Sequence, residues 1–116
     1  MKIKRFGIGP RMSKAVRYGD TVYVAGQIAD DPSLDVAGQT AQVLAKVDAA
    51  LAEAGTDKEN LLSATIYLAD MSTFEAMNSV WDRWVVPDNT PARATVEAKL
   101  ARPGLKVEVS IIAARK

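Results

Sequence analysis

The pattern of apolar and polar residues changes period along the chain, and each change predicts a new element. Residues 12–19 and 20–28 are two apolar-rich runs that meet at Gly19-Asp20, which predicts a pair of strands joined by a tight turn. Residues 36–54 place their apolar side chains at helical spacing instead, so that one face of a helix would be apolar. The first half of the chain is therefore predicted to be two strands followed by a helix.

The second half continues with patterns of the same kinds. Alternation in residues 60–71 predicts a third strand, and helical spacing in residues 73–85 predicts a second helix. Residues 91–100 and 105–114 alternate again and predict the last two strands. The predicted order is β-β-α-β-α-β-β, which corresponds to an α+β fold with two helices packed on one face of a mixed sheet.

The last two predicted strands carry two residues of chemical interest. The turn signal Arg102-Pro103-Gly104 lies between these strands and predicts an antiparallel hairpin. In that hairpin Arg93 and Glu108 would project from the same face of the sheet, although alternation does not establish contact between them. A guanidinium near a carboxylate suits the capture of a small carboxylic acid, because the guanidinium offers a planar fork and the carboxylate can hold a water. The alternative is a cross-strand salt bridge.

The face of the predicted sheet that the helices leave uncovered mixes apolar and polar residues. Its predicted members are Tyr23, Ala25, Ser63, Thr65, Tyr67, Ala69, Arg93, Thr95, Glu108, Ser110, Ile112 and Ala114. Such a face is too apolar for contact with water and too polar for an ordinary core. We therefore expect it to meet a copy of itself.

Composition adds limits on size, partners and location. At 116 residues the chain is expected to form a single domain, residues 1–116. Its 15 basic and 14 acidic residues are scattered, and a net charge of +1 gives no long-range attraction to nucleic acid or to an anionic membrane. There is no signal-peptide pattern and no apolar stretch of membrane length. With no cysteine, a cytoplasmic location is the default expectation.

The lack of histidine and cysteine restricts the chemistry further. It excludes Ser-His-Asp triads, Cys-His dyads, the usual zinc sites and histidine acid–base cleavage of RNA. The chain also has no glycine-rich phosphate loop. Any catalysis must therefore use arginine, carboxylates, tyrosine, hydroxyl groups, backbone amides and water.

Several short motifs occur together and in order along nearly the whole chain. They are Gly9-Pro10, the run from Gly19 to Ile28, Gln39-Thr40 with Gln42, Asn78 with Trp81 and Trp84, Pro91-Ala92-Arg93, and Lys106-Val107-Glu108-Val109. In this combination the chain resembles the RidA/YjgF family of small enamine and imine deaminases, which is also catalogued as L-PSP.

The resemblance implies a RidA-like (chorismate-mutase-like) fold that assembles as a homotrimer, with the sheets lining a central barrel and the active sites between subunits. It also implies hydrolysis of reactive 2-imino or enamine acids to 2-oxo acids and ammonia, with no metal and no organic cofactor. The indirect partners would be pyridoxal-phosphate enzymes that release such imines.

By the same resemblance, the central roles belong to residues of the last two strands. Arg93 would clamp the substrate carboxylate with both arms of its guanidinium, and the backbone amide of Thr95 would complete the anion site. Glu108 would orient the attacking water. The structural alternative for Glu108 is an ion pair on the strand face, either with Arg93 or with a neighbour such as Lys106.

Three further residues would line the cleft of such a protein. Gly26 would leave bare backbone where the ligand approaches, unless it only forms a bulge or a turn. Asn78 and Trp84 lie on the second predicted helix, nearly on one face with Trp81. The two tryptophans are expected in the core, with Trp84 also a candidate wall of the pocket.

The chain departs from the best-known deaminases of the family at three positions. Arg11 stands where they have tyrosine, Ala25 where they usually have serine, and Thr95 where they often have cysteine. A cation in place of a phenol at the pocket rim would favour a second carboxylate or a phosphate on the ligand, unless Arg11 is simply a surface charge. These departures are compatible with deaminase chemistry and leave the familiar 2-aminoacrylate substrate open.

Two other functions remain open at this point. A trimer could bind a small carboxylate ligand at the same site without turning it over. Some members of the family carry a ribonuclease or translation-inhibitor label. The lack of histidine, of an acidic metal cluster and of a basic aromatic surface argues against direct RNA chemistry here.

Overall fold

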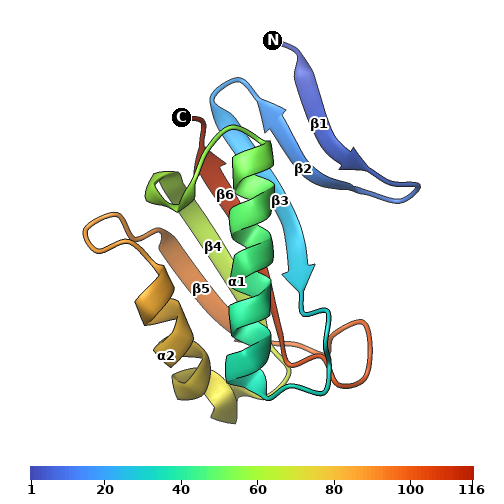
Figure 1. Cartoon of the computed structure of the whole chain (residues 1–116), viewed down its shortest axis with the longest axis vertical. Coiled ribbons are helices and arrows are strands. Elements are labelled where there is room, and N and C mark those ends of the chain that lie inside the picture. Colours follow the sequence, from blue (N-terminus) through green and yellow to red (C-terminus); the bar gives the residue numbers. More distant parts are fainter.

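Six strands and two α-helices make up the fold, which the computed structural model describes over residues 1–116 (Figure 1). The strands are β1 (Ile3–Ile8), β2 (Ser13–Tyr18), β3 (Thr21–Ile28), β4 (Leu61–Leu68), β5 (Ala92–Glu97) and β6 (Val107–Ala114); the helices are α1 (Val36–Glu53) and α2 (Phe74–Trp84), and the short 3-10 turns are η1 (Lys58–Asn60) and η2 (Met71–Thr73). The α+β class and the packing of both helices on one face of a mixed sheet are as predicted.

Helix α1 supplies most of the helical side of the core. The carboxylate of Asp35 caps its first turn by accepting a hydrogen bond from the Gly38 amide at 2.8 Å, and Gly55, with a φ of +89°, lets the chain turn away after it. Its buried face consists of Val36, Gln39, Thr40, Val43, Leu44, Val47, Ala50 and Leu51. No helix is both long and apolar enough to cross a membrane.

The strand order is β1-β2-β3-β6-β4-β5, with β1 and β5 at the two free edges. Every neighbouring pair is antiparallel except β4 and β5, which run parallel. Helix α2 connects these two parallel strands, as a parallel pair requires a crossover between its members. The sheet therefore contains a β4–α2–β5 unit that places α2 beside the β5 edge (Figure 1).

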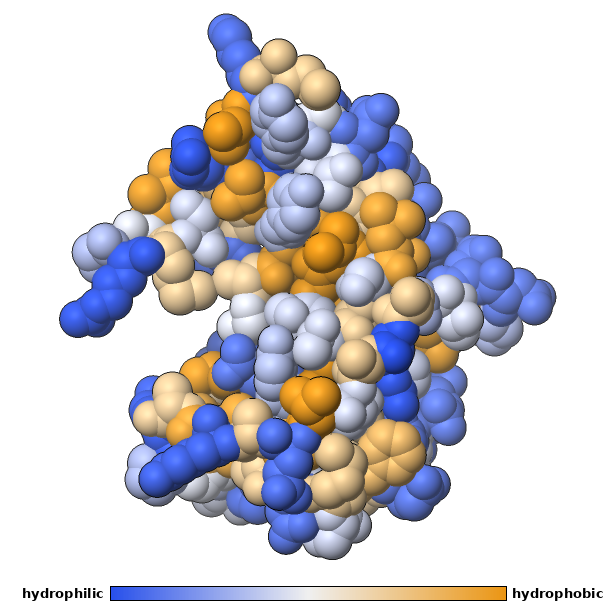
Figure 2. Space-filling model, turned by 180° about the vertical axis from the view of Figure 1, so that it is seen from behind, coloured by the Kyte–Doolittle hydropathy of each residue, from blue (hydrophilic) through white to orange (hydrophobic).

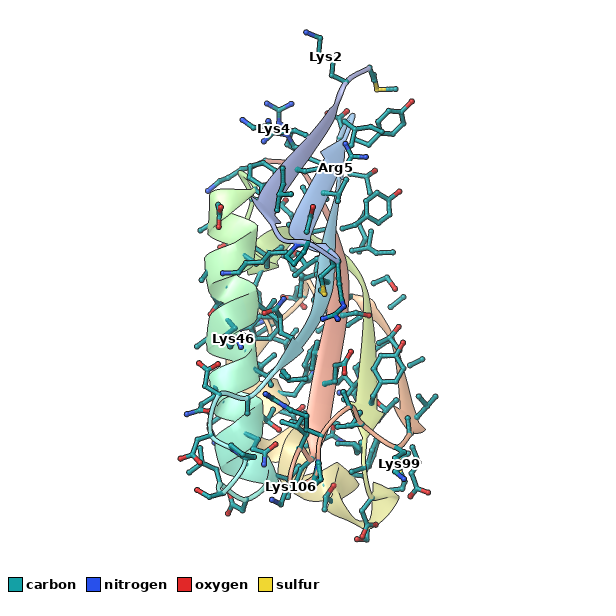
Figure 3. The ribbon with its side chains drawn as sticks, turned by 90° about the vertical axis from the view of Figure 1, so that its right-hand side faces the viewer. Lys2, Lys4, Arg5, Lys46, Lys99 and Lys106 are labelled. Carbon is teal, nitrogen blue, oxygen red and sulfur yellow. The ribbon has the colours of Figure 1, made fainter.

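Strand β1 is absent from the predicted order. It pairs with β2 through a register that includes Lys4 with Arg17 and Phe6 with Ala15. Five of its six residues are exposed, because it is an edge strand beyond the reach of the helices. Neighbouring side chains leave it on opposite sides of the sheet, as Lys4 and Arg5 show in Figure 3. A strand with two accessible faces has no apolar stripe, and so its sequence lacks the alternation that marks the others.

The predicted hairpin of the last two strands is wrong. β6 lies between β3 and β4 and is antiparallel to both, whereas β5 pairs only with β4. The connection crosses the end of β4, where Ala69 donates to the Lys106 carbonyl at 3.0 Å and Ala98 donates to the Leu68 carbonyl at 2.9 Å. The prediction assumed that consecutive strands are neighbours in the sheet, which is the common case but not a requirement.

A buried glutamine fixes the place where β6 begins. Gln39 of α1 is fully buried, and its Oε1 accepts a hydrogen bond from the Lys106 amide at 2.8 Å. Its Nε2 lies 2.8 Å from the Gly104 carbonyl, 3.0 Å from that of Leu34 and 3.2 Å from that of Pro32. One side chain thus ties α1, the loop before it and the start of β6 together.

The open face of the sheet, on the side away from the helices, mixes tyrosine, aliphatic and polar residues. Strand pairing places these residues on it: Ile3, Arg5, Val16, Tyr18, Thr21, Tyr23, Ile28, Ser63, Thr65, Tyr67, Val96, Glu108, Ser110, Ile112 and Ala114. Tyr18 and Tyr23 remain 45% and 47% exposed. Apolar patches gather over this face in Figure 2, and no second layer covers it in Figure 3. Exposed apolar patches among polar residues are typical of an interface between proteins.

Candidate functional site

Arg93 projects from β5 toward α2, on the helical side of the sheet. It pairs in register with Ala64 of β4, whose side chain is 2% exposed and belongs to the core. Its guanidinium carbon lies 5.3 Å from the centroid of the Trp81 ring and 5.8 Å from that of Phe74, both on α2. These distances are within the range of cation–π attraction. Arg93 is therefore half-buried against two aromatic rings at an open sheet edge.

No carboxylate neutralises this guanidinium. The only ion pairs of the chain join Lys46 to Asp30 and Lys116 to Asp57, each at 3.0 Å. Arg93 also donates no hydrogen bond to any other side chain or to a carbonyl group. An arginine held on aromatic faces keeps its N–H edges available for a planar anion, such as a carboxylate.

Two buried polar atoms near this position have no hydrogen-bond partner. They are Oγ1 of Thr95, two residues after Arg93 on the same side of β5, and Oδ1 of Asn78, on α2 between the two aromatic residues. Buried polar atoms without partners are rare in folded proteins and call for an explanation. A bound ligand would supply one, since it would bring donors and acceptors of its own.

Glu108 belongs to a second group of residues, on the open face. It pairs in register with Tyr67 of β4 and with Ile28 of β3. Its carboxylate covers Gly26, which lies in a bulge of β3 between Val24 and Gln27. A Cβ atom at position 26 would collide with that carboxylate, being 2.9 Å from its carbon. Glycine is therefore needed here so that the Glu108 side chain can lie across β3.

The expectation that Arg93 and Glu108 share a face is wrong. Residues paired across a ladder point to the same side of a sheet, and Arg93 is paired with Ala64 whereas Glu108 is paired with Tyr67. Ala64 and Tyr67 are three residues apart on β4 and so face opposite ways. Thr95, paired with Ile66, follows Arg93 to the helical side. The two predicted catalytic groups are thus separated by the sheet and can share a ligand only across two copies of the chain.

The other predicted residues lie apart from Arg93. Arg11 is exposed in the turn between β1 and β2, at the edge of the sheet opposite β5, whereas Ala25 lies in the bulge of the interior strand β3, beside β6. Trp84 donates through Nε1 to Asp48 of α1 at 3.0 Å and lies under Lys58. Trp84 also packs on Trp81, with 5.3 Å between the ring centroids, so it approaches Arg93 only through Trp81, and its role as a wall of the pocket stays a prediction.

The aromatic residues that do contact Arg93 were missed by the sequence argument. Phe74, Asn78 and Trp81 stand at positions i, i+4 and i+7 of α2, which places them on one helix face. That spacing is readable in the sequence. The sequence argument placed the tryptophans in the core, where Trp81 does lie, and did not connect this helix face with Arg93. The largest hollow of the surface, about 620 Å³, is lined by residues 97–105 with Ala69 and includes none of the predicted site residues.

Comparison with known proteins gives consistent relationships over the whole chain. Residues 4–115 match the family model described as "Endoribonuclease L-PSP". A RutC family protein of Haemophilus ducreyi is 46% identical over 112 residues, covering 97% of this chain and 96% of the relative. The RutC family protein YoaB of Escherichia coli is 43% identical over 114 residues, covering 98% and 99%.

The solved structures agree with these sequence matches. A member of the YjgF protein family from Neisseria meningitidis superposes with a TM-score of 0.97 at 46% identity, covering 100% of this chain and 97% of the neighbour. A member of the YjgF/YER057c/UK114 family from Mycobacterium tuberculosis reaches a TM-score of 0.89 at 28% identity, covering 97% and 99%. These relatives and solved structures carry family names, whereas the family model is named for an endoribonuclease.

Proposed function

The chain belongs to the L-PSP family, also named YjgF or RutC, and on that premise we propose that it hydrolyses reactive 2-imino or enamine acids. Water adds to the imine carbon, the carbon–nitrogen bond breaks, and a 2-oxo acid and ammonia leave. Neither a metal nor an organic cofactor is needed for this step, because the imine carbon is already electrophilic. The observation that carries the proposal is the unneutralised guanidinium of Arg93, held half-buried beside two polar atoms that lack partners.

In this mechanism Arg93 binds the substrate carboxylate through a bidentate, charged pair of hydrogen bonds. The backbone amide of Thr95, its side-chain Oγ1 and the side-chain amide of Asn78 complete the binding site. Because Arg93 rests on Phe74 and Trp81, its direction is set before the ligand arrives. Fixing a reactant in one orientation is a large part of the rate enhancement for such a step.

Glu108 is proposed to hold and partly deprotonate the attacking water. Since it lies on the face opposite to Arg93, this role requires that the site form between two subunits. The homotrimer expected from the family provides such a site, and the partly exposed Tyr18 and Tyr23 of the open face favour burial against another copy. Light scattering at micromolar concentration tests this point, and an active monomer would contradict it.

Several finer points of the proposal rest on the sequence. Arg11 in the β1–β2 turn is expected to favour a substrate with a second anionic group. Enzymes that use pyridoxal phosphate would release such imines, and a cytoplasmic location remains a prediction. Nucleic acid is not expected as a partner, although the family model is named for an endoribonuclease.

The direct test couples an amino-acid oxidase, which generates 2-imino acids, to the purified protein. Semicarbazide traps the imine that survives, so that faster hydrolysis appears as less semicarbazone. We expect this loss for the parent protein and not for Arg93→Lys. A range of amino acids, with aspartate and glutamate for the dicarboxylic case, would define the substrate class.

A second candidate is a trimer that binds small carboxylates without turnover. The separation of Glu108 from Arg93 within the chain favours it, because the carboxylate-binding half of the site is complete without Glu108. Calorimetric binding of a 2-oxo acid with no acceleration of imine loss would select this candidate.

A further inference from the structure

We propose that Phe74 and Trp81 form a seat that positions Arg93 without neutralising it, and that this seat sets the affinity of the site for carboxylates. The inference deepens the proposed function and rests on it. Neither aromatic residue has to touch the substrate. Both are positioning residues, which act through the guanidinium.

The geometry places two rings against one guanidinium. Trp81 is 5% exposed and fixed in the core, while Phe74 is partly buried at the first position of α2. The guanidinium carbon lies 5.3 Å and 5.8 Å from their centroids. Because both rings belong to one helix, the seat moves as a unit with α2.

Arg17 provides an internal comparison. Its guanidinium also lies over an aromatic ring, that of Phe6, at 5.5 Å. However, its Nη1 donates to the Ala54 carbonyl at 3.0 Å, so that its edge is occupied as well as its face. Arg17 thus fastens β2 to the end of α1. Arg93 has the same contact with aromatic faces but no hydrogen bond at its edge.

The kind of support decides what an arginine can bind. A carboxylate partner would hold the guanidinium through the same N–H edges that a ligand needs, and it would cancel the charge. An aromatic face attracts the cation through its quadrupole and leaves both edges and charge in place. Arg93 is therefore ready to receive an anion and does not have to release an internal one first.

Variants at position 74 separate the two parts of the proposal. Phe74→Leu removes one ring and should weaken calorimetric binding of pyruvate by about fivefold. Phe74→Glu places a carboxylate beside Arg93, and Phe74→Gln is its neutral control of equal size. Pyruvate binding should be weaker in Phe74→Glu than in Phe74→Gln by a factor of about three or more. A glutamate at the start of α2 suits the helix dipole, so the fold should be retained.

Position 81 supplies the conservative rescue. Trp81→Phe keeps a ring and should bind pyruvate within about twofold of the parent, whereas Trp81→Leu should lose about tenfold. Phe6→Leu, beside Arg17, is the matched control and should leave binding unchanged. In the turnover assay, the position-74 variants should raise KM more than they lower kcat, because the reacting atoms are untouched.

A readout that needs no ligand keeps this inference separate from the proposed function. The Arg93 Nε–H signal in the NMR spectrum should show an upfield ring-current shift that falls in Phe74→Leu and persists in Trp81→Phe. Absence of that shift would overturn the seat. Equal pyruvate affinity in Phe74→Gln and Phe74→Glu would overturn the role of charge. If NMR confirms the seat but the parent protein binds no 2-oxo acid, the carboxylate affinity claimed here is overturned, and so is the binding step of the proposed function. If only imine hydrolysis fails, the seat is unaffected.

Discussion

The polar groups around Gln39 and those around Arg93 are both sheltered from water, but they differ in how they are satisfied. The Gln39 amide contacts three carbonyl oxygens and one backbone amide at 2.8 to 3.2 Å. Around Arg93, the buried atoms of Asn78 and Thr95 have no partner, and the guanidinium has only aromatic faces. The first region is complete within the chain, whereas the second keeps polar groups that have no partner in the chain.

This difference follows from the cost of burying polar groups. A hydrogen bond adds little net stability, but a buried group left without one costs its full desolvation. A protein therefore leaves such groups unpaired only where another requirement outweighs that cost. The Gln39 region therefore serves stability, and the unpaired groups around Arg93 support the proposal that this region binds a ligand. The predictions that follow test this difference between the two regions.

The largest effect is expected on stability, for Gln39→Leu. The substitution preserves approximate size but leaves the buried Lys106 amide without its acceptor. The carbonyls of Pro32, Leu34 and Gly104 lose the Gln39 amide and keep only Lys106 Nζ, at 3.0 to 3.5 Å. We expect the free energy of unfolding to fall by roughly 3 kcal/mol. Urea unfolding of the parent and variant measures this. Gln42→Leu is the control, because Gln42 accepts only one part-buried hydrogen bond, from the Asp31 amide.

The sequence predicts much of the fold, because one-sided burial produces clear alternation. The helices were placed within one residue at each end: residues 36–54 against Val36–Glu53, and residues 73–85 against Phe74–Trp84. Strand β1 was not predicted, because an edge strand with exposed residues on both faces shows no such alternation. The pairing of β5 with β4 was not predicted, because alternation identifies a strand but does not identify its neighbour in the sheet.

The sequence named residues for the candidate site but did not give their arrangement. Strand alternation and side-chain chemistry singled out Arg93 and Glu108, and the family resemblance gave them roles and added Gly26. The structure places the Glu108 carboxylate over Gly26, which explains the glycine there. The error about faces followed from the assumed hairpin, since a strand inserted elsewhere in the sheet changes which residues are paired. Phe74 was missed because a contact between α2 and Arg93 depends on that same pairing.

Glu108→Gln is expected to give the next largest effect, on the rate of hydrolysis. If Glu108 activates the water, the imine-hydrolysis rate should fall by roughly 10²-fold. Affinity for pyruvate should stay constant or rise, since a negative charge has been removed. The semicarbazide assay and calorimetry together measure this. A parallel loss of binding and activity would place Glu108 in the binding half of the site instead.

Arg93→Lys should affect binding most. Lysine keeps the charge but lacks the planar fork, and a bidentate charged contact is worth about 1.5 to 3 kcal/mol. Pyruvate affinity should therefore fall by roughly tenfold or more, with the unfolding free energy nearly unchanged. Turnover within about twofold of the parent would show that Arg93 is only structural and would remove the distinction drawn between the two polar regions.

The smallest effect is expected for the exposed pair of Asp57 and Lys116, a polar contact that is satisfied but not buried. The hydrogen bond from Lys116 Nζ, at 3.0 Å, is the main cause that lowers the pKa of Asp57, and the backbone amide of Glu59 adds to it. The same hydrogen bond to Asp57 raises the pKa of Lys116. The side chains are 37% and 71% exposed, so solvent screens the pair and its contribution to stability is small.

The pH dependence of Asp57→Asn follows from these two directions. Because the carboxyl pKa is lower in the folded state, the pair stabilises the fold at pH values above the unfolded-state pKa of about 3.9. That stabilisation is lost as the pH falls through the folded-state pKa. Because the lysine pKa is higher in the folded state, the pair also stabilises the fold at pH values below the unfolded-state pKa of about 10.4. That stabilisation is lost as the pH rises through the folded-state pKa. The difference in melting temperature between parent and variant should therefore form a plateau between about pH 4 and pH 10. Asp31→Asn is the control, because the pKa of Asp31 is lowered by hydrogen bonds from Ser33 with no cation, so its difference curve should have an acid edge only. An alkaline edge in that control would mean that net charge rather than the local pair governs the response to pH. A flat curve for Asp57→Asn would mean that the pair contributes no measurable stability.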